Sequence, residues 1–442
     1  MSIFNTPQGQ HGHNRLNDAV ADVFERYNAA NPKSHERWQQ SKDVMPGGNT
    51  RTVLHYDPFP LTMVKGEGPY LHDLDGHKYT DFLGEYSAGL YGHSHPILIK
   101  AIKDAIDEGM VLGAPNQWEA KLAGVICERF PSIDMVRFTN SGTEANLMAL
   151  GAARAFTKRD KVMVFDGGYH GGVLYFAHGT SPLNAPFDFV MGAYNEIEKT
   201  LTLIEQNASD LACVLLEPMM GAGGCLPADP DFLKALREIT KKHGIVLIFD
   251  EVMTSRSSSG GLQKRLGVTP DITTLGKYIG GGASFGGFGG RSDIMEQFDP
   301  TKPGALAHAG TFNNNVITMA AGLAGMSEIF TPDVAEAHYQ RGNDFRDRLN
   351  AMISKHGLSL QFTGVGSILG FHTHNNPVRI PADAKDPVPD KQTLIHLEMM
   401  LRGFVYATRG YFTISLTLSD DDLDNFVTAF DEVISTHAEL LV

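Results

Sequence analysis

The chain of 442 residues carries 37 Lys and Arg against 51 Asp and Glu, which gives a formal net charge of −14. This balance provides no overall electrostatic basis for binding nucleic acid or an anionic membrane, so an anionic ligand would need cations placed locally. With 42% hydrophobic and 20% charged residues, the composition is that of a globular protein and argues against disordered, fibrous and disulfide-stapled classes. The length predicts two or three domains with a large core.

The three cysteines, Cys127, Cys213 and Cys225, are widely spaced and form no CxxC motif. Such cysteines predict free thiols in a reducing compartment rather than disulfides or a cysteine-based zinc site. The N-terminus has no basic segment followed by an apolar one, and no run of about 18 apolar residues occurs in the chain. We therefore expect a cytoplasmic protein without a membrane-spanning segment.

The N-terminal part of the chain predicts an arm, a helix and a small sheet in that order. Residues 1–15 are polar and predict a mobile arm, and a helical pattern begins near Leu16. Residues 61–86 alternate short apolar stretches with glycines, and the Asp75-Gly76 pair is a turn signal between strand-like flanks. This segment predicts a small antiparallel meander.

The middle of the chain has a different sequence pattern. From Pro96 to about Gly322, helical stretches such as HPILIKAIKDAIDEG alternate with short apolar runs such as KVMVF, ACVLLEP and GIVLIFDEV. Because buried strands that alternate with helices form parallel sheets, this region predicts an α/β domain with a parallel sheet.

The C-terminal part predicts an α+β domain. Amphipathic segments at 331–357 and 419–441 are separated by strand-like pieces at 367–374 and 410–418. The Pro- and Asp-rich stretch 377–392, inside this domain, predicts a surface loop.

The segment VRFTNSGTEANLMALGAARAF places Ser141, Gly142 and Thr143 between a strand-like run and a helix. Hydroxyl groups and free N–H groups at a helix N-terminus form an anion site that suits a phosphate. The same residues fit an ordinary helix cap equally well, with Glu144 as the capping partner. No Walker or GxGxxG pattern is present, which disfavours nucleotide and nicotinamide binding.

Two further residues have positions that favour chemistry. The apolar strand GIVLIFDEV ends in Asp250, and active groups of parallel sheets lie at the carboxyl ends of strands, although a helix-capping Asp is the alternative. Lys277 lies in an apolar, Gly-rich passage, where an unpaired ammonium is costly to bury, so a functional role is favoured over a surface lysine. A phosphate site, a carboxylate and a lysine in this order match the requirements of pyridoxal 5′-phosphate (PLP).

The ordered motifs FTNSGTEAN, FDGGYHG, LLEP, LIFDEV, TLGKYIGGG and HAGTFNNN resemble those of the class III aminotransferases of PLP fold type I. The resemblance covers the chain from about Pro46 to the C-terminal helix. It implies an α/β fold, in which a large domain with a mostly parallel central sheet between helices carries PLP. A small α+β domain is built from both chain ends, with expected boundaries of 1–75, 76–322 and 323–442.

The same resemblance implies roles for single residues. Lys277 is expected to form the Schiff base and move the proton, Asp250 to pair with the pyridinium nitrogen, and Gly142 and Thr143, beside Ser141, to bind the phosphate. Three more residues are implied in the site: Tyr169 stacked on the cofactor ring, Glu217 near it, and Thr311 at the phosphate of the neighbouring subunit. The last role implies a homodimer. Without the family context, Tyr169 could be a core aromatic and Thr311 a turn residue.

Two arginines indicate a branch of the family. The PGG motif resembles that of glutamate-1-semialdehyde aminomutases, but PGGNTR with Arg51 and TRGYFTISL with Arg409 resemble the aminotransferases of aromatic β-amino acids such as β-phenylalanine. In that group, Arg51 is implied to hold the carboxylate of the β-amino acid. Arg409 is implied to hold the carboxylate of a keto acid such as 2-oxoglutarate or pyruvate. A guanidinium suits both roles because it binds a carboxylate with two hydrogen bonds. Tyr86 and Tyr91 could wall a side-chain pocket or be core aromatics.

Two alternatives stay open at this point. An aminomutase or another isomerase would return the amino group to the same substrate, and a noncatalytic PLP-binding protein would turn nothing over. Three HxH pairs invite a metal hypothesis, which we disfavour because no third ligand recurs at a consistent spacing: His11/His13, His93/His95 and His372/His374. His93 and His95 are expected to cap the helix that follows them.

Overall fold

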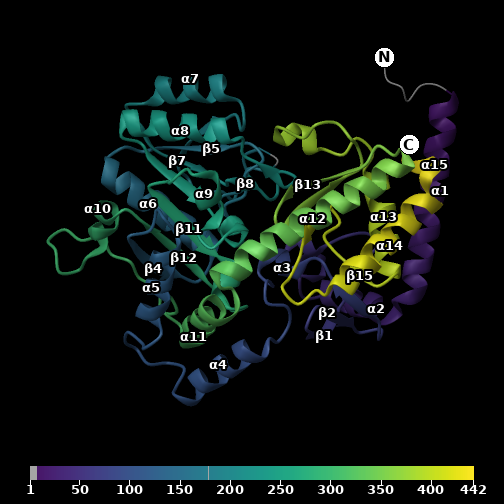
Figure 1. The fold of residues 1–442 in the computed structure, drawn as a ribbon, viewed down its shortest axis with the longest axis horizontal. Helices are drawn as coiled ribbons and strands as arrows, with labels where there is room; N and C mark the ends of the chain where they lie inside the picture. The colour runs from purple at the N-terminus through teal and green to yellow at the C-terminus, as the bar shows by residue number, and fades with distance from the viewer. Residues whose placement is uncertain (1–6, 178) are drawn as a thin grey trace.

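A central sheet organises the larger half of the molecule (Figure 1). The computed structural model describes residues 7–442 except residue 178, and only the backbone of residues 7–14. The sheet has seven strands in the order β4 (Met135–Thr139), β12 (Gly286–Gly290), β11 (Ile272–Gly276), β10 (Val246–Asp250), β7 (Leu211–Leu216), β5 (Lys161–Phe165) and β6 (Asp188–Gly192). β12 runs antiparallel to both of its neighbours, and the other neighbouring pairs run parallel. The predicted α/β fold with a mostly parallel sheet is confirmed.

Both faces of this sheet are buried, which explains the unbroken apolar runs of its strands. Along β10, Ile248 packs on one face with helices α6 (Gly142–Thr157) and α10 (Ser292–Met295), because alternate side chains point to opposite faces. Its neighbour Leu247 packs on the other face with α7 (Ile197–Asn207) and α8 (Pro230–His243). A hairpin of β8 (Met219–Met220) and β9 (Leu226–Pro227) and the short helix α9 (Gly261–Leu266) lie beside these layers.

A separate apolar cluster joins three helices that lie below the sheet in Figure 1. They are α4 (Pro96–Asp107), α5 (Glu119–Arg129) and α11 (Val316–Ala324). The cluster also contains Leu275 of β11 and Tyr91, which is 2% exposed, with its ring centroid 6.1 Å from that of Tyr278. Tyr91 is therefore a core aromatic, not a pocket wall.

The two chain ends form the second half together. The predicted meander is present as β1 (Met63–Glu67), β2 (Tyr70–Asp73) and β3 (Lys78–Asp81), and β15 (Phe404–Val405) extends it parallel to β3. β3 pairs with β2 on one side and with β15 on the other, so residues 78–81 belong to a sheet that is built from both ends of the chain. The division of the chain at residues 75 and 322 stays a prediction.

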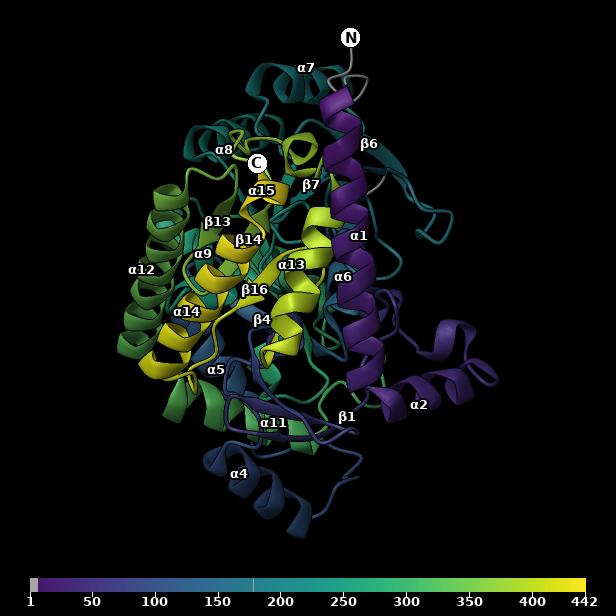
Figure 2. The same cartoon turned by 90° about the vertical axis from the view of Figure 1, so that its right-hand side faces the viewer.

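A second small sheet and a set of helices complete this half. It consists of β13 (Gln361–Val365), β14 (Ile368–His372) and β16 (Tyr411–Thr413), all antiparallel. The helices are α1 (Pro7–Ala30), α2 (Pro32–Lys42), α3 (Gly84–Ser87), α12 (Pro332–His356), α13 (Pro389–Leu401), α14 (Asp420–Thr436) and α15 (Ala438–Leu441). Figure 2 shows α1 running along α13, and Val23 and Tyr27 pack there against Leu394 and Leu397.

Two sequence expectations were wrong at helix starts. The helix that we expected near Leu16 begins at Pro7, and α13 begins at Pro389, inside the expected loop 377–392. Both helices start at a proline, which fits the first helical turn because no acceptor is needed there for its missing N–H. The rest of the predicted mobile arm, residues 1–6, lies outside the described residues. Within the described part of the chain, none of the helices is long and apolar enough to cross a bilayer.

Candidate active site

Lys277 lies where a central strand ends. β11 stops at Gly276, and Lys277 follows in a left-handed conformation with φ of +54°. Its amino group donates a hydrogen bond to the backbone carbonyl of Tyr86. Burial lowers the pKa of Lys277 to about 8, and the positive charge of Arg409 acts in the same direction. More of this amine is therefore neutral near neutral pH than in an exposed lysine.

Asp250, the last residue of β10, is buried in a polar network. Its Oδ2 lies 2.8 Å from Nδ1 of His170 and accepts a hydrogen bond of 2.8 Å from Nδ2 of Asn146. Its Oδ1 accepts a 3.0 Å hydrogen bond from the backbone N–H of Val252. Asn146 is itself held by the Thr274 hydroxyl, which donates to its Oδ1 over 2.8 Å. The network fixes the carboxylate and compensates its loss of water with donors.

The segments that carry Gly142, Asp250 and Lys277 all contact Val252. A Cβ added to Gly142 at the start of α6 would lie 2.8 Å from a Val252 methyl, and one added to Gly276 would lie 2.9 Å from another. Both distances are shorter than the contacts that Cβ atoms make in proteins. Only glycine therefore allows the start of α6 and the end of β11 to lie so close to Val252. The helix N-terminus, Asp250 and Lys277 are thus brought to one edge of the sheet, where the strand-end pattern predicts Asp250.

The start of α6 combines a cap with an anion-binding geometry. Ser141 is the N-cap, and its hydroxyl accepts a 3.2 Å hydrogen bond from the N–H of Glu144, so the capping interpretation of Ser141 is correct. The Thr143 hydroxyl accepts a 3.3 Å hydrogen bond from the N–H of Gly172. Since the first N–H groups of a helix have no acceptor within it, those of Gly142 and Thr143 can serve an anion as well.

Tyr169 and Glu217 are linked through the backbone. Glu217 is buried after β7, and its two carboxylate oxygens accept hydrogen bonds of 2.9 Å from the N–H groups of Tyr169 and Gly221. Burial raises the pKa of Glu217 to about 7. Tyr169 as a whole is 45% exposed, and its ring packs edge-on against Tyr175, with 5.7 Å between the ring centroids. Glu217 therefore positions the segment that presents an accessible aromatic ring.

Arg51 and Arg409 come from opposite ends of the chain and meet at Tyr86. Their guanidinium carbons lie 5.3 Å and 5.6 Å from the centroid of the Tyr86 ring. The Tyr86 ring stacks on that of Tyr411 at a centroid distance of 5.9 Å, and its hydroxyl donates a 2.9 Å hydrogen bond to the carbonyl of Val53. Because the Tyr86 carbonyl also accepts from Lys277, one residue connects both arginines to the lysine.

The turn that carries Tyr86 has an unusual backbone. Gly84, Glu85, Tyr86 and Ser87 have φ values of +52°, +48°, +54° and +75°. Left-handed conformations of residues other than glycine cost energy and persist where the surroundings hold them, as they do at many functional sites. Here the Asp81 carboxylate accepts from the N–H of Gly84 over 2.9 Å at the start of the turn, and the Ser87 carbonyl accepts from Arg256 over 3.2 Å at its end.

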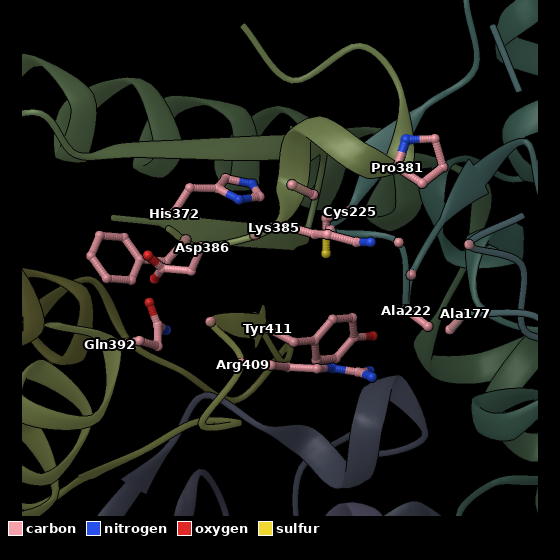
Figure 3. A pocket seen from close by; sticks show the side chains of 18 of the residues that line it. Ala177, Ala222, Cys225, His372, Pro381, Lys385, Asp386, Gln392, Arg409 and Tyr411 are labelled. Atoms are coloured by element: carbon pink, nitrogen blue, oxygen red, sulfur yellow. The ribbon is translucent and has the colours of Figure 1, made fainter. Parts of the chain in front are cut away.

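A cavity of about 770 Å³ opens beside Arg409 and Tyr411 (Figure 3). One wall is the glycine-rich segment 221–225 that follows Glu217, and another is the segment 381–393 with Lys385, Asp386 and Gln392. Tyr175, which packs against Tyr169, also lines it. The cavity leaves space next to Arg409, whereas Lys277, Asp250 and Arg51 are not among the residues that line it.

Thr311 lies apart from this constellation within the single chain. It is exposed on the loop before α11, next to Phe312, whose side chain is exposed as well. No hydrogen bond joins Thr311 to another residue in the part of the chain that the structure describes. Its expected role at the site of a neighbouring subunit therefore stays a prediction.

Two histidines of the HxH pairs, His93 and His372, have side-chain partners within the described chain. His93 Nε2 lies 2.9 Å from Asp81. His95 occupies the N-cap position of α4, but its side chain makes no capping hydrogen bond, so the expectation that both side chains cap this helix was wrong. His372 Nε2 lies 2.8 Å from the Thr363 hydroxyl. The side chains of His11 and His13 lie outside the described residues. Elsewhere in the described chain, His, Cys, Asp and Glu form no group of three that could hold a metal ion.

Three residues of the site were missed by sequence reasoning. Asn146 lies one helical turn after Gly142, on the face of α6 that Gly142 turns to the site, and this spacing could have indicated it. His170 follows Tyr169 directly in GGYHG. Glu85 forms an ion pair with Arg51, a contact that nothing in the sequence indicates.

Comparison with known proteins places this geometry in a family. The model of the family described as aminotransferase class-III matches residues 53–434. The chain is 49% identical over 429 residues to a β-phenylalanine transaminase of Variovorax paradoxus, covering 97% of this chain and 99% of that protein. The crystal structure of a β-phenylalanine aminotransferase from the same organism superposes with a TM-score of 0.94, at 49% identity over 96% of this chain and 98% of that one.

Two further solved structures are similar to this chain at lower sequence identity. An ω-transaminase from Sphaerobacter thermophilus is 35% identical, with a TM-score of 0.87 and coverage of 91% of this chain and 97% of that one. A glutamate-1-semialdehyde aminomutase from Pseudomonas aeruginosa has a TM-score of 0.88 at 23% identity, over 96% of this chain and 98% of that one, which shows a shared fold alone. With a family match over most of its length and a relative near half identity, the chain belongs to the class III aminotransferases, which are PLP-dependent enzymes.

Proposed function

We propose that the protein transfers the amino group of an aromatic β-amino acid, of the β-phenylalanine type, to a 2-oxo acid such as 2-oxoglutarate or pyruvate. The observation that carries this proposal is that Arg51 and Arg409 both lie against the ring of Tyr86, the residue whose backbone carbonyl accepts a hydrogen bond from Lys277. Two carboxylate-binding groups beside one lysine suit two different carboxylate substrates that use one site in turn. The 49% identity to a β-phenylalanine transaminase supports the same substrate class.

The residues at the sheet edge fit PLP by their chemistry. We propose that Ser141, Gly142 and Thr143 hold its phosphate at the start of α6, where backbone N–H groups are free of helical acceptors. Asp250 would bind the protonated pyridine nitrogen, since the structure surrounds this buried carboxylate with neutral donors and His170. Tyr169, with its accessible ring, would stack on the cofactor, and Glu217 would keep the Tyr169 backbone in place.

When bound, PLP would supply an electron sink for the amine-bearing carbon of the substrate. Lys277 would take the proton from that carbon, because burial lowers its pKa to about 8 and leaves part of the amine neutral. The Tyr86 carbonyl orients the Lys277 amino group through its hydrogen bond. Arg51 would hold the carboxylate of the β-amino acid and Arg409 that of the 2-oxo acid, each with a guanidinium that stays charged.

A reaction with the amino donor alone tests the function. In a transaminase the amino group stays on the cofactor. Excess β-phenylalanine without an acceptor should therefore convert one equivalent of bound PLP per site, and the absorbance of the bound PLP should fall in the same proportion. Added 2-oxoglutarate or pyruvate should restore the absorbance. An aminomutase would return to its starting spectrum without an acceptor, and a noncatalytic PLP-binding protein would release no product; either outcome contradicts the proposal.

We also propose that the protein works as a homodimer in the cytoplasm. Apolar side chains of Met110, Val111, Leu112 and Phe312 are exposed in the single chain, on the segment after α4 and on the Thr311 loop, which supports a covering partner there. The three cysteines are all free, which supports a reducing compartment.

The role of Thr311 gives a prediction about pairs of variants. If Thr311 serves the neighbouring site, a heterodimer of one Lys277→Ala subunit and one Thr311→Ala subunit contains one fully native site and one doubly altered site. Heterodimers purified with two different affinity tags should then show, per intact Lys277, the activity and PLP affinity of the unaltered protein. A heterodimer whose remaining site behaves like the Thr311→Ala homodimer would show that Thr311 acts within its own subunit.

A further inference from the structure

The strained turn Gly84–Ser87 places a carboxylate on one of the two arginines. Glu85 forms an ion pair with Arg51, while the Arg51 guanidinium also lies 5.3 Å from the Tyr86 ring centroid. Arg51 is the cation to which the proposed function assigns the donor carboxylate. The protein thus already holds a carboxylate of its own where that of the substrate is expected.

The position of Glu85 is fixed by its neighbours in the chain. Its φ of +48° lies in a run of left-handed residues that is bound at both ends, by Asp81 at Gly84 and by Arg256 at Ser87. Between them, the Tyr86 carbonyl accepts from Lys277. Because the backbone on both sides of Glu85 is tied to the site, only its side-chain torsions are free to change when a ligand arrives.

The second arginine has no such partner. Arg409 lies 5.6 Å from the Tyr86 ring centroid and 5.5 Å from that of Tyr411, and no carboxylate of the described chain forms an ion pair with it. The two cations therefore differ: Arg51 is neutralised within the protein, and Arg409 is open to a ligand. The Arg51–Glu85 pair is also easily exchanged, since its side chains are 42% and 60% exposed and exposed ion pairs contribute little free energy.

We propose that Glu85 is a specificity-determining residue that acts as the internal counter-ion of Arg51, released when the carboxylate of a β-amino acid binds and returned when it leaves. This inference rests on the proposed function. It assigns Glu85 two effects. First, Glu85 weakens the binding of any carboxylate at Arg51. Second, it neutralises the Arg51 charge while a monocarboxylic acceptor is bound at Arg409. The two substrates therefore bind to different arginines.

Binding of 3-phenylpropanoate to the PLP-loaded protein tests this inference. This acid has the carboxylate and ring of β-phenylalanine without the amine, so calorimetry reports its binding without turnover. Glu85→Gln removes the charge with little change in shape and should bind the acid about two- to fivefold more tightly than the unaltered protein. Glu85→Asp keeps the charge and should show a smaller gain. In an Arg51→Ala background, Glu85→Gln should change nothing, because the two substitutions act through one contact.

Two substrates serve as internal controls. Glu85→Gln should lower the KM for β-phenylalanine but not that for 1-phenylethylamine, which has no carboxylate, nor that for pyruvate, whose carboxylate is assigned to Arg409. If Arg51→Ala weakens binding of 3-phenylpropanoate while Glu85→Gln leaves it unchanged or weaker, the counter-ion inference is wrong and the proposed function stands. If Arg51→Ala leaves that binding unchanged, the assignment of Arg51 fails and the inference fails with it.

Discussion

Replacing Lys277 with alanine is expected to abolish measurable transamination while the protein still binds PLP noncovalently. In the proposed function, the substitution removes both the covalent anchor of the cofactor and the group that moves the proton, and loss of a general base alone lowers rates on the order of 10²–10⁴-fold. The proposed phosphate site at Gly142 and Thr143 and the carboxylate of Asp250 are untouched, so PLP should remain in the proposed site. Turnover with β-phenylalanine and 2-oxoglutarate, together with the PLP content after gel filtration, measures both parts.

A matched control is Lys355→Ala, at an exposed lysine near the end of α12, which should keep full activity. Turnover of Lys277→Ala near that of the control would remove Lys277 from the mechanism. Loss of bound PLP together with loss of folded structure, seen by circular dichroism, would instead show that Lys277 supports the fold.

Alanine substitutions of the two arginines are expected to separate the two substrates. A hydrogen-bonded contact with a charged group contributes about 1.5–3 kcal/mol, so losing one guanidinium should cost about 10- to 100-fold in kcat/KM for the substrate that it binds. Arg51→Ala should lose this factor for β-phenylalanine and much less for pyruvate. Arg409→Ala should show the reverse, because Arg409 lines the cavity without a carboxylate partner, whereas Arg51 is paired with Glu85.

The rates of the two half-reactions, measured separately by stopped-flow absorbance, provide this comparison without mixing the substrates. Arg348→Ala, at an exposed arginine paired with Asp424 on the surface, is a suitable control for the loss of a positive charge from this acidic chain. Equal losses for both substrates in both variants would contradict separate carboxylate sites. An unchanged β-phenylalanine rate in Arg51→Ala would refute its assignment.

Much of the site could be predicted because its residues follow buried strands. Asp250 ends the buried strand β10 and Lys277 directly follows the buried strand β11, and the carboxyl ends of parallel strands share one edge of the sheet. The glycines of the motifs reflect the same packing, since Gly142 and Gly276 are both required by their contact with Val252. Where the function depends on which strand ends where, local patterns in the sequence are informative.

Contacts between distant segments could not be predicted in this way. The pair of Arg51 and Glu85 depends on a left-handed turn formed by residues other than glycine, which propensity rules disfavour. His170 and Asn146 reach Asp250 only after α6 packs on the sheet. The helix start at Pro7 was missed because the polar composition of residues 1–15 was interpreted as a mobile arm, and the start at Pro389 because the Pro- and Asp-rich stretch was interpreted as a loop. Proline nevertheless suits the first turn of a helix.

Isotope transfer tests the central claim most directly. The protein is supplied with β-phenylalanine labelled with ¹⁵N, together with unlabelled 2-oxoglutarate and pyruvate, and the products are analysed by mass spectrometry. We predict labelled glutamate or alanine in a one-to-one ratio with the 3-oxo acid or its decarboxylation product. Recovery of the label in an isomer of the donor, with neither glutamate nor alanine labelled, would show an isomerase and contradict the proposed function.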